Sequence, residues 1–230
     1  MSRKSQYNGK YFSILGDSIS TLVGYNPPEC AVFYDWGNKC LSDVYTPEDT
    51  WWGQVIDALG GQLLVNHSWS GSLVCRHPSC EIESYGCSDA RTGALGAEGR
   101  TPDVIMILLG LNDRGWGMRI TPGGGEDGLS VFSVAYEVML EKIKRNYPQA
   151  EVWCMTLPLS RGGAFQGAVG RRITDYCQAI RACGEKAGCK VVDLYRPEQP
   201  YETVDGKHPN AEGMKTIAAA ALDEVRNMVQ

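Results

Sequence analysis

The chain has 230 residues, of which 43% are hydrophobic, so it is long enough to bury a full core as one domain spanning residues 1–230. Its net charge of -5 and pI near 5.3 argue against nucleic acids or anionic membranes as partners, because both bind basic surfaces. The segment from Met1 to Asp17 lacks the apolar core of a secretory signal and no stretch is apolar enough to span a membrane, so we expect a soluble, cytoplasmic protein.

The apolar pattern predicts strands that alternate with helices. In chain order we expect a strand at 11–15, a helix at 50–59 capped by Asp49, strands at 62–66 and 103–109, and a helix at 130–146. A strand at 151–156, a helix at 169–187, a strand at 190–194 and a last helix, capped by Asn210 and running to about Met228, follow. The 103–109 segment is apolar on both faces, as a central parallel strand is. This order predicts an α/β sandwich with a five-stranded parallel sheet.

Three stretches, 20–48, 70–100 and 121–128, show no regular pattern and are expected to be irregular. Loops of this length in a compact domain are usually functional or disordered. Ligands of open parallel sheets bind beyond the carboxyl ends of the strands. The polar motifs of this chain follow predicted strands, so we expect the functional site at that edge of the sheet.

Ser18, in the tetrapeptide Gly16-Asp17-Ser18-Ile19, directly follows the first predicted strand. A serine hydroxyl is a weak nucleophile until a base removes its proton, and an acceptor must hold that base in one tautomer. His208 can serve as the base and Asp205, three residues earlier, as the acceptor. These three residues predict a Ser-His-Asp hydrolase built from the two ends of the chain.

A tetrahedral intermediate also needs hydrogen-bond donors for its oxyanion. Gly71 follows the second predicted strand and can offer its backbone N–H, while Asn112 follows the third and can offer its side-chain amide. Together with the backbone N–H of Ser18, they form a predicted oxyanion hole of three donors.

Four short blocks resemble, in order, the motifs of the SGNH (GDSL-type) hydrolases. They are Gly-Asp-Ser after the first strand, a glycine after the second, Gly-x-Asn-Asp after the third and Asp-x-x-His before the last helix. The resemblance spans the length of the chain. It implies a three-layer α/β/α, flavodoxin-like fold and ester hydrolysis through a serine-bound acyl intermediate.

The resemblance also implies a role for each matching residue. Ser18 is then the nucleophile, His208 the base, Asp205 the residue that orients it, and Gly71 and Asn112 the oxyanion donors beside the Ser18 N–H. Asp17 and Asp113 match the motifs but are expected to bond loop backbone. The insert at 72–100 lies outside the shared blocks and is expected to shape the substrate pocket, so the substrate does not carry over.

Other interpretations of single residues remain open. Ser18 can be a helix cap or part of a phosphate-binding turn, as in flavin-binding proteins of flavodoxin-like fold, but this leaves Asn112 and His208 unexplained. His67 is more consistent with a core or supporting histidine than with a base. His77 is expected to be an ordinary loop residue.

The chain contains nine cysteines, which we expect to be reduced and mostly structural thiols. Cys75, Cys80 and Cys87 cluster with His77, which makes zinc an alternative. Their spacing lacks the close C-x2-C pairs of common structural zinc sites, so no metal is expected. The proposed chemistry needs no cofactor.

Aromatic residues are concentrated around the predicted site. Trp69 and Trp116 stand beside the oxyanion residues and are predicted to contact substrate, and Tyr25, Phe33, Tyr34, Trp36 and Tyr45 occur in the first long loop. We therefore predict an esterase for small or carbohydrate-linked esters such as O-acetyl groups. The alternatives are a lipase or thioesterase with an acyl-chain pocket and a non-catalytic carbohydrate or small-ligand binding domain. The sequence does not indicate the oligomeric state.

Overall fold

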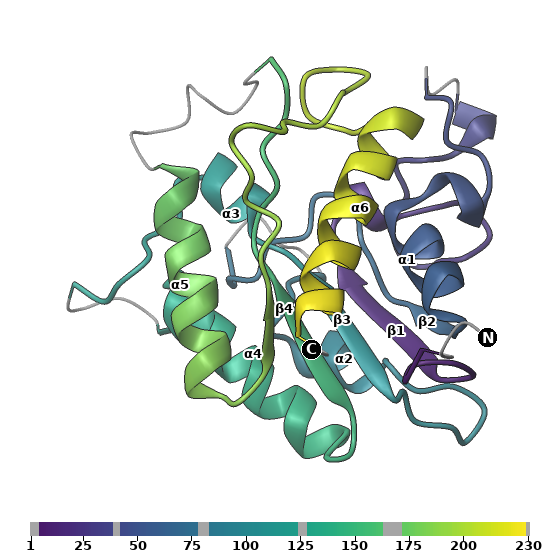
Figure 1. Cartoon of the computed structure of the whole chain (residues 1–230). Helices are drawn as coiled ribbons and strands as arrows, with labels where there is room; N and C mark the ends of the chain where they lie inside the picture. Colours follow the sequence, from purple (N-terminus) through teal and green to yellow (C-terminus); the bar gives the residue numbers. More distant parts are fainter. Residues whose placement is uncertain (1–4, 39–41, 78–82, 124–127, 163–171, 229–230) are drawn as a thin grey trace.

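The computed structural model describes residues 5–38, 42–77, 83–123, 128–162 and 172–228 (Figure 1). Its described part is built around a five-stranded parallel sheet with the strand order β2-β1-β3-β4-β5. The strands are β1 (Tyr11–Gly16), β2 (Gln62–Asn66), β3 (Val104–Leu108), β4 (Glu151–Met155) and β5 (Lys190–Val192). This confirms the predicted five-stranded parallel sheet, although β5 ends earlier than expected.

Helices cover both faces of the sheet, as Figure 1 shows. Helices α1 (Trp51–Leu59) and α6 (Ala211–Asn227) pack side by side on one face, and α2 (Asp89–Gly93), α4 (Phe132–Asn146) and α5 (Ile173–Lys186) lie on the other. The short α3 (Leu111–Gly115) follows β3 at its carboxyl end. The three-layer α/β/α architecture is therefore confirmed.

The two predicted helix caps have different outcomes. Asn210 caps α6 as expected, because its side-chain oxygen accepts a hydrogen bond from the Gly213 N–H at 2.8 Å. The expectation for Asp49 was wrong: Thr50 has the extended backbone of a cap and accepts from the Gly53 N–H at 3.0 Å. Asp49 instead ends a short 3-10 helix.

Several element bounds also differ from the expectation. The 70–100 stretch is not wholly irregular, since it contains α2, whose five residues are too few to show a helical period. Helix α4 begins at Phe132 because residues 128–130 form a separate 3-10 turn. Helix α5 begins at Ile173, and the expected start at 169 lies outside the described residues.

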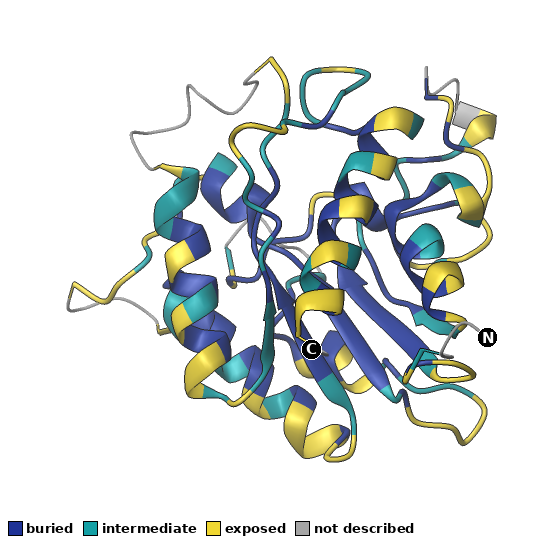
Figure 2. Cartoon of the chain, in the orientation of Figure 1, coloured by how far each residue is buried: buried dark blue, intermediate teal, exposed yellow. Residues whose placement is uncertain are grey.

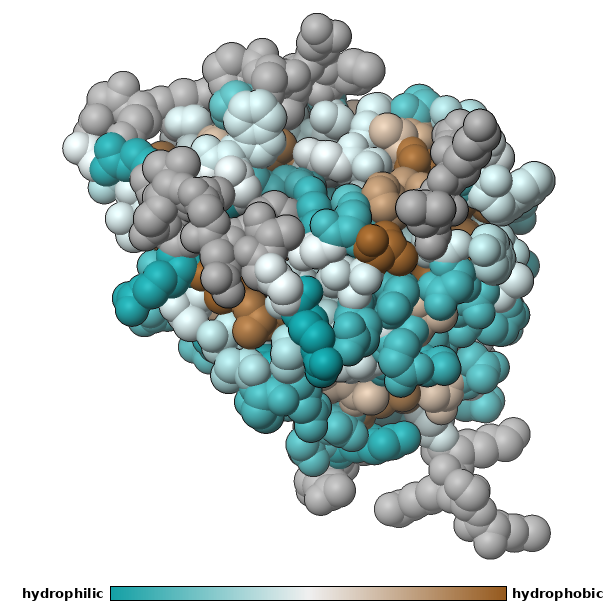
Figure 3. All heavy atoms as spheres, turned by 90° about the horizontal axis from the view of Figure 1, so that it is seen from above, coloured by the Kyte–Doolittle hydropathy of each residue, from teal (hydrophilic) through white to brown (hydrophobic). Residues whose placement is uncertain are grey.

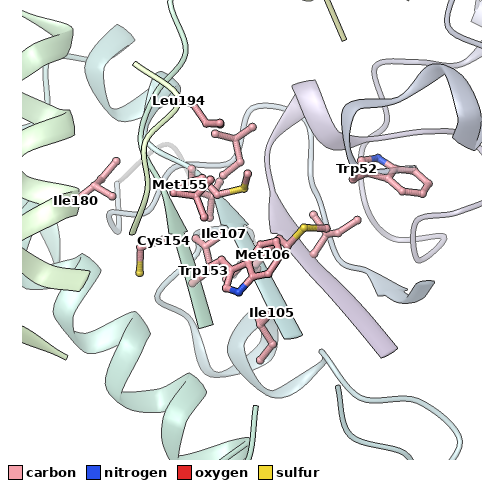
Figure 4. Close-up of a cluster of buried hydrophobic side chains, with 14 of the residues drawn as sticks. Trp52, Ile105, Met106, Ile107, Trp153, Cys154, Met155, Ile180 and Leu194 are labelled. Carbon is pink, nitrogen blue, oxygen red and sulfur yellow. The ribbon is translucent and has the colours of Figure 1, made fainter. Parts of the chain in front are cut away.

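The core lies on both sides of the sheet. All five residues of β3 are buried, which fits its central place in the strand order (Figure 2). Figure 4 shows buried side chains of β3 and β4 in this core, and Met106 of β3 lies opposite Trp153 in the register of the two strands. The Trp153 ring meets Phe12 of β1 nearly edge-on, with the ring centroids 5.9 Å apart. These contacts fix the central strands whose carboxyl ends support the site.

Seen from above, at the carboxyl ends of the strands, the described surface is mostly hydrophilic with separate hydrophobic patches (Figure 3). No helix in the described ranges combines the length and apolar character needed to cross a bilayer.

Candidate active site

Ser18 is placed by the abrupt end of β1. At Gly16 an added Cβ would lie 2.7 Å from Ser20 Oγ and 2.8 Å from Ser68 Oγ, so only glycine fits there. The Asp17 carboxylate accepts a hydrogen bond from the Ile19 N–H at 3.0 Å and caps the 3-10 turn that carries Ser18. The serine is thus held rigidly at the strand end, with only 1% of its surface exposed.

His208 and Asp205 reach Ser18 from the loop before α6. The Nε2 atom of His208 lies 2.9 Å from Ser18 Oγ, and its Nδ1 atom lies 2.7 Å from Asp205 Oδ2. The second carboxylate oxygen of Asp205 accepts from the backbone N–H of His208 at 2.7 Å and of Lys207 at 2.9 Å. The structure therefore brings the three predicted residues into one hydrogen-bonded chain.

The surroundings of His208 favour its neutral form, which can act as a base. Burial lowers the pKa of His208 below its ordinary value, and the charge of Lys207 acts in the same direction, whereas Asp205 opposes the shift. Burial alone would raise the pKa of Asp205, but hydrogen bonds from the His208 backbone and ring outweigh it, so that pKa is lowered. Near neutral pH, His208 can accept a proton while Asp205 stays ionised.

An aromatic contact that the sequence did not reveal holds the His208 ring. Phe33 stacks on the imidazole with the ring centroids 3.5 Å apart and the planes inclined by 16°. The adjacent Tyr34 is buried and donates its hydroxyl hydrogen bond to the Pro209 carbonyl oxygen at 2.7 Å. The first long loop thus orients the histidine, a role that no local signal in the loop could indicate.

Gly71 occupies a tight turn after β2. The Ser72 N–H donates to the Trp69 carbonyl oxygen at 3.0 Å, and Gly71 has a φ of +83° at the third position of this turn. No atom lies within 4 Å of where a Cβ would stand, so the backbone conformation, rather than lack of space, favours glycine. The turn presents an open stretch of backbone on the exposed side.

Asn112 connects this turn to the end of β3. It is buried near the start of α3 and donates from Nδ2 to the Ser72 carbonyl oxygen at 2.9 Å, while its Oδ1 accepts from Lys207 Nζ at 2.8 Å. The predicted oxyanion residues Gly71 and Asn112 thereby lie on two directly bonded segments.

Asp17 and Asp113 bond loop backbone, which confirms their expected structural role. The buried Asp113 carboxylate accepts from the N–H groups of Val74 at 2.8 Å and Cys75 at 3.0 Å. Burial raises the pKa of Asp113, and it raises that of Asp17 to about 6. The two carboxylates tie the strand ends β1 and β3 to their neighbouring loops.

Arg91 is a fully buried arginine that sequence analysis did not single out. It donates to the carbonyl oxygens of Gly16 at 3.0 Å and His67 at 2.6 Å, to His67 Nδ1 at 2.9 Å and to Ser72 Oγ at 2.7 Å, and it also bonds the Ser84 carbonyl oxygen. Burial lowers its pKa to about 10. Burial and then the charge of Arg91 lower the pKa of His67 to about 4, which fits a supporting histidine.

The two tryptophans predicted to contact substrate differ in exposure. Trp69 is partly buried in the turn with Gly71, whereas Trp116 follows α3 and is 57% exposed. The Trp116 ring meets His77 with the ring centroids 4.8 Å apart. Trp69 follows β2 in the segment that carries Gly71, and Trp116 follows β3 in the segment that carries Asn112.

Two arginines near the carboxyl ends of the strands differ in their surroundings. Arg114 is buried, and burial lowers its pKa. Arg161 is exposed and forms an ion pair with Glu202 at 3.0 Å.

The described cysteines are free thiols. Cys75 and Cys87 are both buried, and burial raises the pKa of Cys87 to about 12. Cys80, the third member of the alternative zinc cluster, lies outside the described residues. Within the described part of the chain, no three metal-ligating side chains gather into a cation site.

The arrangement is chemically competent for acyl transfer. A histidine in contact with both a serine hydroxyl and a carboxylate can take the serine proton and keep its tautomer. The backbone N–H groups of an accessible turn and a fixed side-chain amide beside it can donate hydrogen bonds to a negatively charged oxygen.

Known proteins of similar fold were compared with this chain. A candidate GDSL-like lipase from Bacteroides ovatus is 24% identical and superimposes with a TM-score of 0.75, covering 96% of this chain and 99% of that protein. A carbohydrate acetylesterase from Sinorhizobium meliloti is 15% identical, with a TM-score of 0.66 over 95% and 99% of the two chains. These likenesses establish the shared fold.

A curated relative is the cellulase/esterase CelE of Acetivibrio thermocellus, 24% identical over 133 residues. The match takes in 55% of this chain but spans only 14% of that larger protein. The family model of the GDSL-like lipases and acylhydrolases matches residues 10–225. The chain therefore belongs to the GDSL-like lipase/acylhydrolase family.

Proposed function

We propose that this protein is a serine esterase that hydrolyses small or carbohydrate-linked esters, such as O-acetyl groups, through Ser18, His208 and Asp205. The observation that carries the proposal is the chain of contacts from Ser18 Oγ through the His208 ring to the Asp205 carboxylate, at 2.9 and 2.7 Å. A role of Ser18 as a helix cap or in a phosphate-binding turn would not require these contacts with His208 and Asp205.

In the proposed first step, His208 Nε2 accepts the Ser18 proton as Oγ attacks the ester carbonyl carbon. The carbonyl π electrons move to oxygen, and the backbone N–H groups of Ser18 and Gly71 and the Asn112 amide stabilise that oxyanion. The Asn112 amide nitrogen carries two hydrogens, one of which bonds Ser72, and the other is assigned to the oxyanion.

The intermediate then collapses and the bond to the leaving alcohol breaks. The protonated His208 gives its proton to the leaving oxygen, so an alcohol departs and the acyl group stays on Ser18. In the second half, His208 takes a proton from water, the hydroxide oxygen attacks the acyl carbon, and the proton returns to Ser18 as the acid leaves. Asp205 keeps the ring oriented and offsets the imidazolium charge.

A preference for acetylated sugars is supported by two observations. The names of two similar proteins state carbohydrate acetylesterase and cellulase/esterase activities, and the exposed Trp116 near Asn112 offers a face on which a sugar ring can stack. The family also contains lipases and acylhydrolases, so an acyl-chain pocket is the second candidate.

Hydrolysis of p-nitrophenyl acetate, butyrate and octanoate by the wild-type protein and Ser18→Ala tests the proposal. We expect Ser18→Ala to lose at least a factor of about 10³ in kcat with the fold intact, because the proposed acyl intermediate forms on the Ser18 hydroxyl. Ser133→Ala on α4 is a matched control that should retain wild-type rates.

The rates across the ester series separate the candidates. The fastest turnover on acetate, extended to acetylated sugars, supports the deacetylase, whereas rates that rise with chain length support a lipase or thioesterase. Full activity in Ser18→Ala contradicts the proposal. Binding of acetylated sugars without any turnover would make the protein a binding domain.

A further inference from the structure

Lys207 is a partly buried lysine between the two residues that form the acid–base pair. Its backbone N–H donates to Asp205 and its carbonyl oxygen accepts from the Tyr201 hydroxyl at 2.7 Å. The side chain leaves this loop and donates from Nζ to Asn112 Oδ1 at 2.8 Å, a contact between residues 95 positions apart. The segment that supplies the base thus also reaches an oxyanion-hole residue on another strand end.

This contact determines which way the Asn112 amide faces. An ammonium group has three donors and no acceptor, so it can bind the amide oxygen but not the amide nitrogen. The nitrogen is held from the other side, because it donates to the Ser72 carbonyl oxygen at 2.9 Å. With both ends anchored, the amide plane is fixed, and the N–H assigned to the oxyanion keeps its direction.

The same contact places a positive charge near developing negative charge. The Lys207 charge acts to lower the pKa of the buried Asp17, which precedes Ser18 in the chain, and of His208, which contacts Ser18. Asp113 and Arg91 also act on Asp17, and Asp205 is the carboxylate that faces His208. A cation on the amide oxygen also draws electron density from the amide and makes its N–H groups stronger donors.

We propose that Lys207 is a positioning residue of the oxyanion hole, which holds and polarises the Asn112 amide so that it stabilises the transition state. The inference rests on the proposed esterase function and deepens it. In this role Lys207 contacts the Asn112 amide rather than the reacting atoms. Because Lys207 acts through Asn112, the effects on kcat of replacing the two residues should not be additive.

Kinetics of Lys207→Met, Asn112→Ala and the double variant on p-nitrophenyl acetate test this. We expect Lys207→Met to lower kcat by about 10- to 100-fold with KM within about twofold, since the contact acts in the transition state. In the Asn112→Ala background the same change should cost less than about threefold, because the group that Lys207 positions is gone. Lys207→Arg, which keeps a donor-only cation, should recover part of kcat.

Controls separate folding and function from positioning. Lys215→Met removes a lysine on α6 that is exposed and pairs with Glu212, so it should leave kcat unchanged. Thermal unfolding of each variant shows whether a lost rate reflects a lost fold, and Lys207→Gln offers a second neutral side chain if Lys207→Met does not fold. Ser18→Ala in the same assay reports on the esterase proposal itself.

If Ser18→Ala is inactive, so that the esterase proposal stands, two results would still overturn the role of Lys207. Equal loss of kcat on removing Lys207 with and without Asn112 would mean that the lysine acts independently of the amide. A rise in KM with unchanged kcat would place the ammonium against the substrate instead. If Ser18→Ala keeps its activity, the esterase proposal fails first.

Discussion

At the residue scale, the site depends on a few side chains whose orientation is fixed by more than one contact. His208 contacts Ser18 and Asp205 through its two ring nitrogens and lies flat against Phe33. Asn112 is likewise held at both ends of its amide. Because these contacts hold the side chains from more than one direction, little reorganisation is required when charge develops in the proposed reaction.

The pKa of His208 leads to a prediction for the pH dependence of esterase activity. The base must be neutral, and burial and then Lys207 lower its pKa below the ordinary 6.5. The acid limb of kcat/KM should therefore have its midpoint below about 6.5. Asp205 raises this pKa, so Asp205→Asn should move the limb to lower pH while the maximal rate falls.

A pH–rate profile of the wild-type protein and Asp205→Asn measures both effects. Asp17 has a pKa of about 6 and titrates in the same range, but only a limb that belongs to His208 should move in the variant. A wild-type midpoint above 7, or a limb that does not move, contradicts the assignment of His208 as base.

At the element scale, the carboxyl ends of β1, β2 and β3 are tied together by buried polar groups. The Trp69 N–H donates to the Gly16 carbonyl oxygen at 3.1 Å, which joins the ends of β1 and β2. Asp113 joins the end of β3 to the loop after β2, and Arg91 of α2 binds both Gly16 and His67. The insert that carries α2 therefore supports the ends of β1 and β2, which carry the site.

Replacing the buried arginine should destabilise the protein strongly. Arg91→Met keeps most of the side-chain volume but removes the hydrogen bonds from the guanidinium to the carbonyl oxygens of Gly16 and His67, at a cost of about 3 kcal/mol or more. For a chain of this size we expect the Tm to fall by about 6–12 °C.

Thermal unfolding by circular dichroism measures this change. Arg226→Met, at an arginine that is exposed near the end of α6, is the matched control and should shift the Tm by less than about 2 °C. Equal Tm values for Arg91→Met and the wild type would show that the buried hydrogen bonds do not support the strand ends.

Much of the fold and of the candidate site could be predicted because the signals are local. The apolar run of β3 and the residues after each strand are visible in short segments, and parallel strands bring their carboxyl ends to one edge. The contact between Lys207 and Asn112 joins segments 95 positions apart and leaves no local pattern. The role of Arg91 is equally hard to predict, because arginine side chains are normally exposed and only the packed structure shows its buried partners.

At the scale of the whole molecule, an early and a late segment of the chain meet at the carboxyl ends of the strands. Ser18 follows β1, while Asp205 and His208 precede α6. Helix α6 packs beside α1 on one face of the sheet (Figure 1). The family model covers this entire span, from residue 10 to 225. The proposed activity therefore requires the complete sheet, because no smaller part contains both the nucleophile and its base.

Covalent trapping with a fluorophosphonate most directly tests the claim that Ser18 is a nucleophile activated by His208. Ser18 Oγ would displace fluoride from phosphorus while its proton passes to His208, leaving a stable adduct on the serine. Peptide mass spectrometry should find the adduct at Ser18 in the wild-type protein, and labelling should be at least about 100-fold slower in His208→Ala. An adduct on a different serine, or equal labelling rates in the two proteins, would contradict the account.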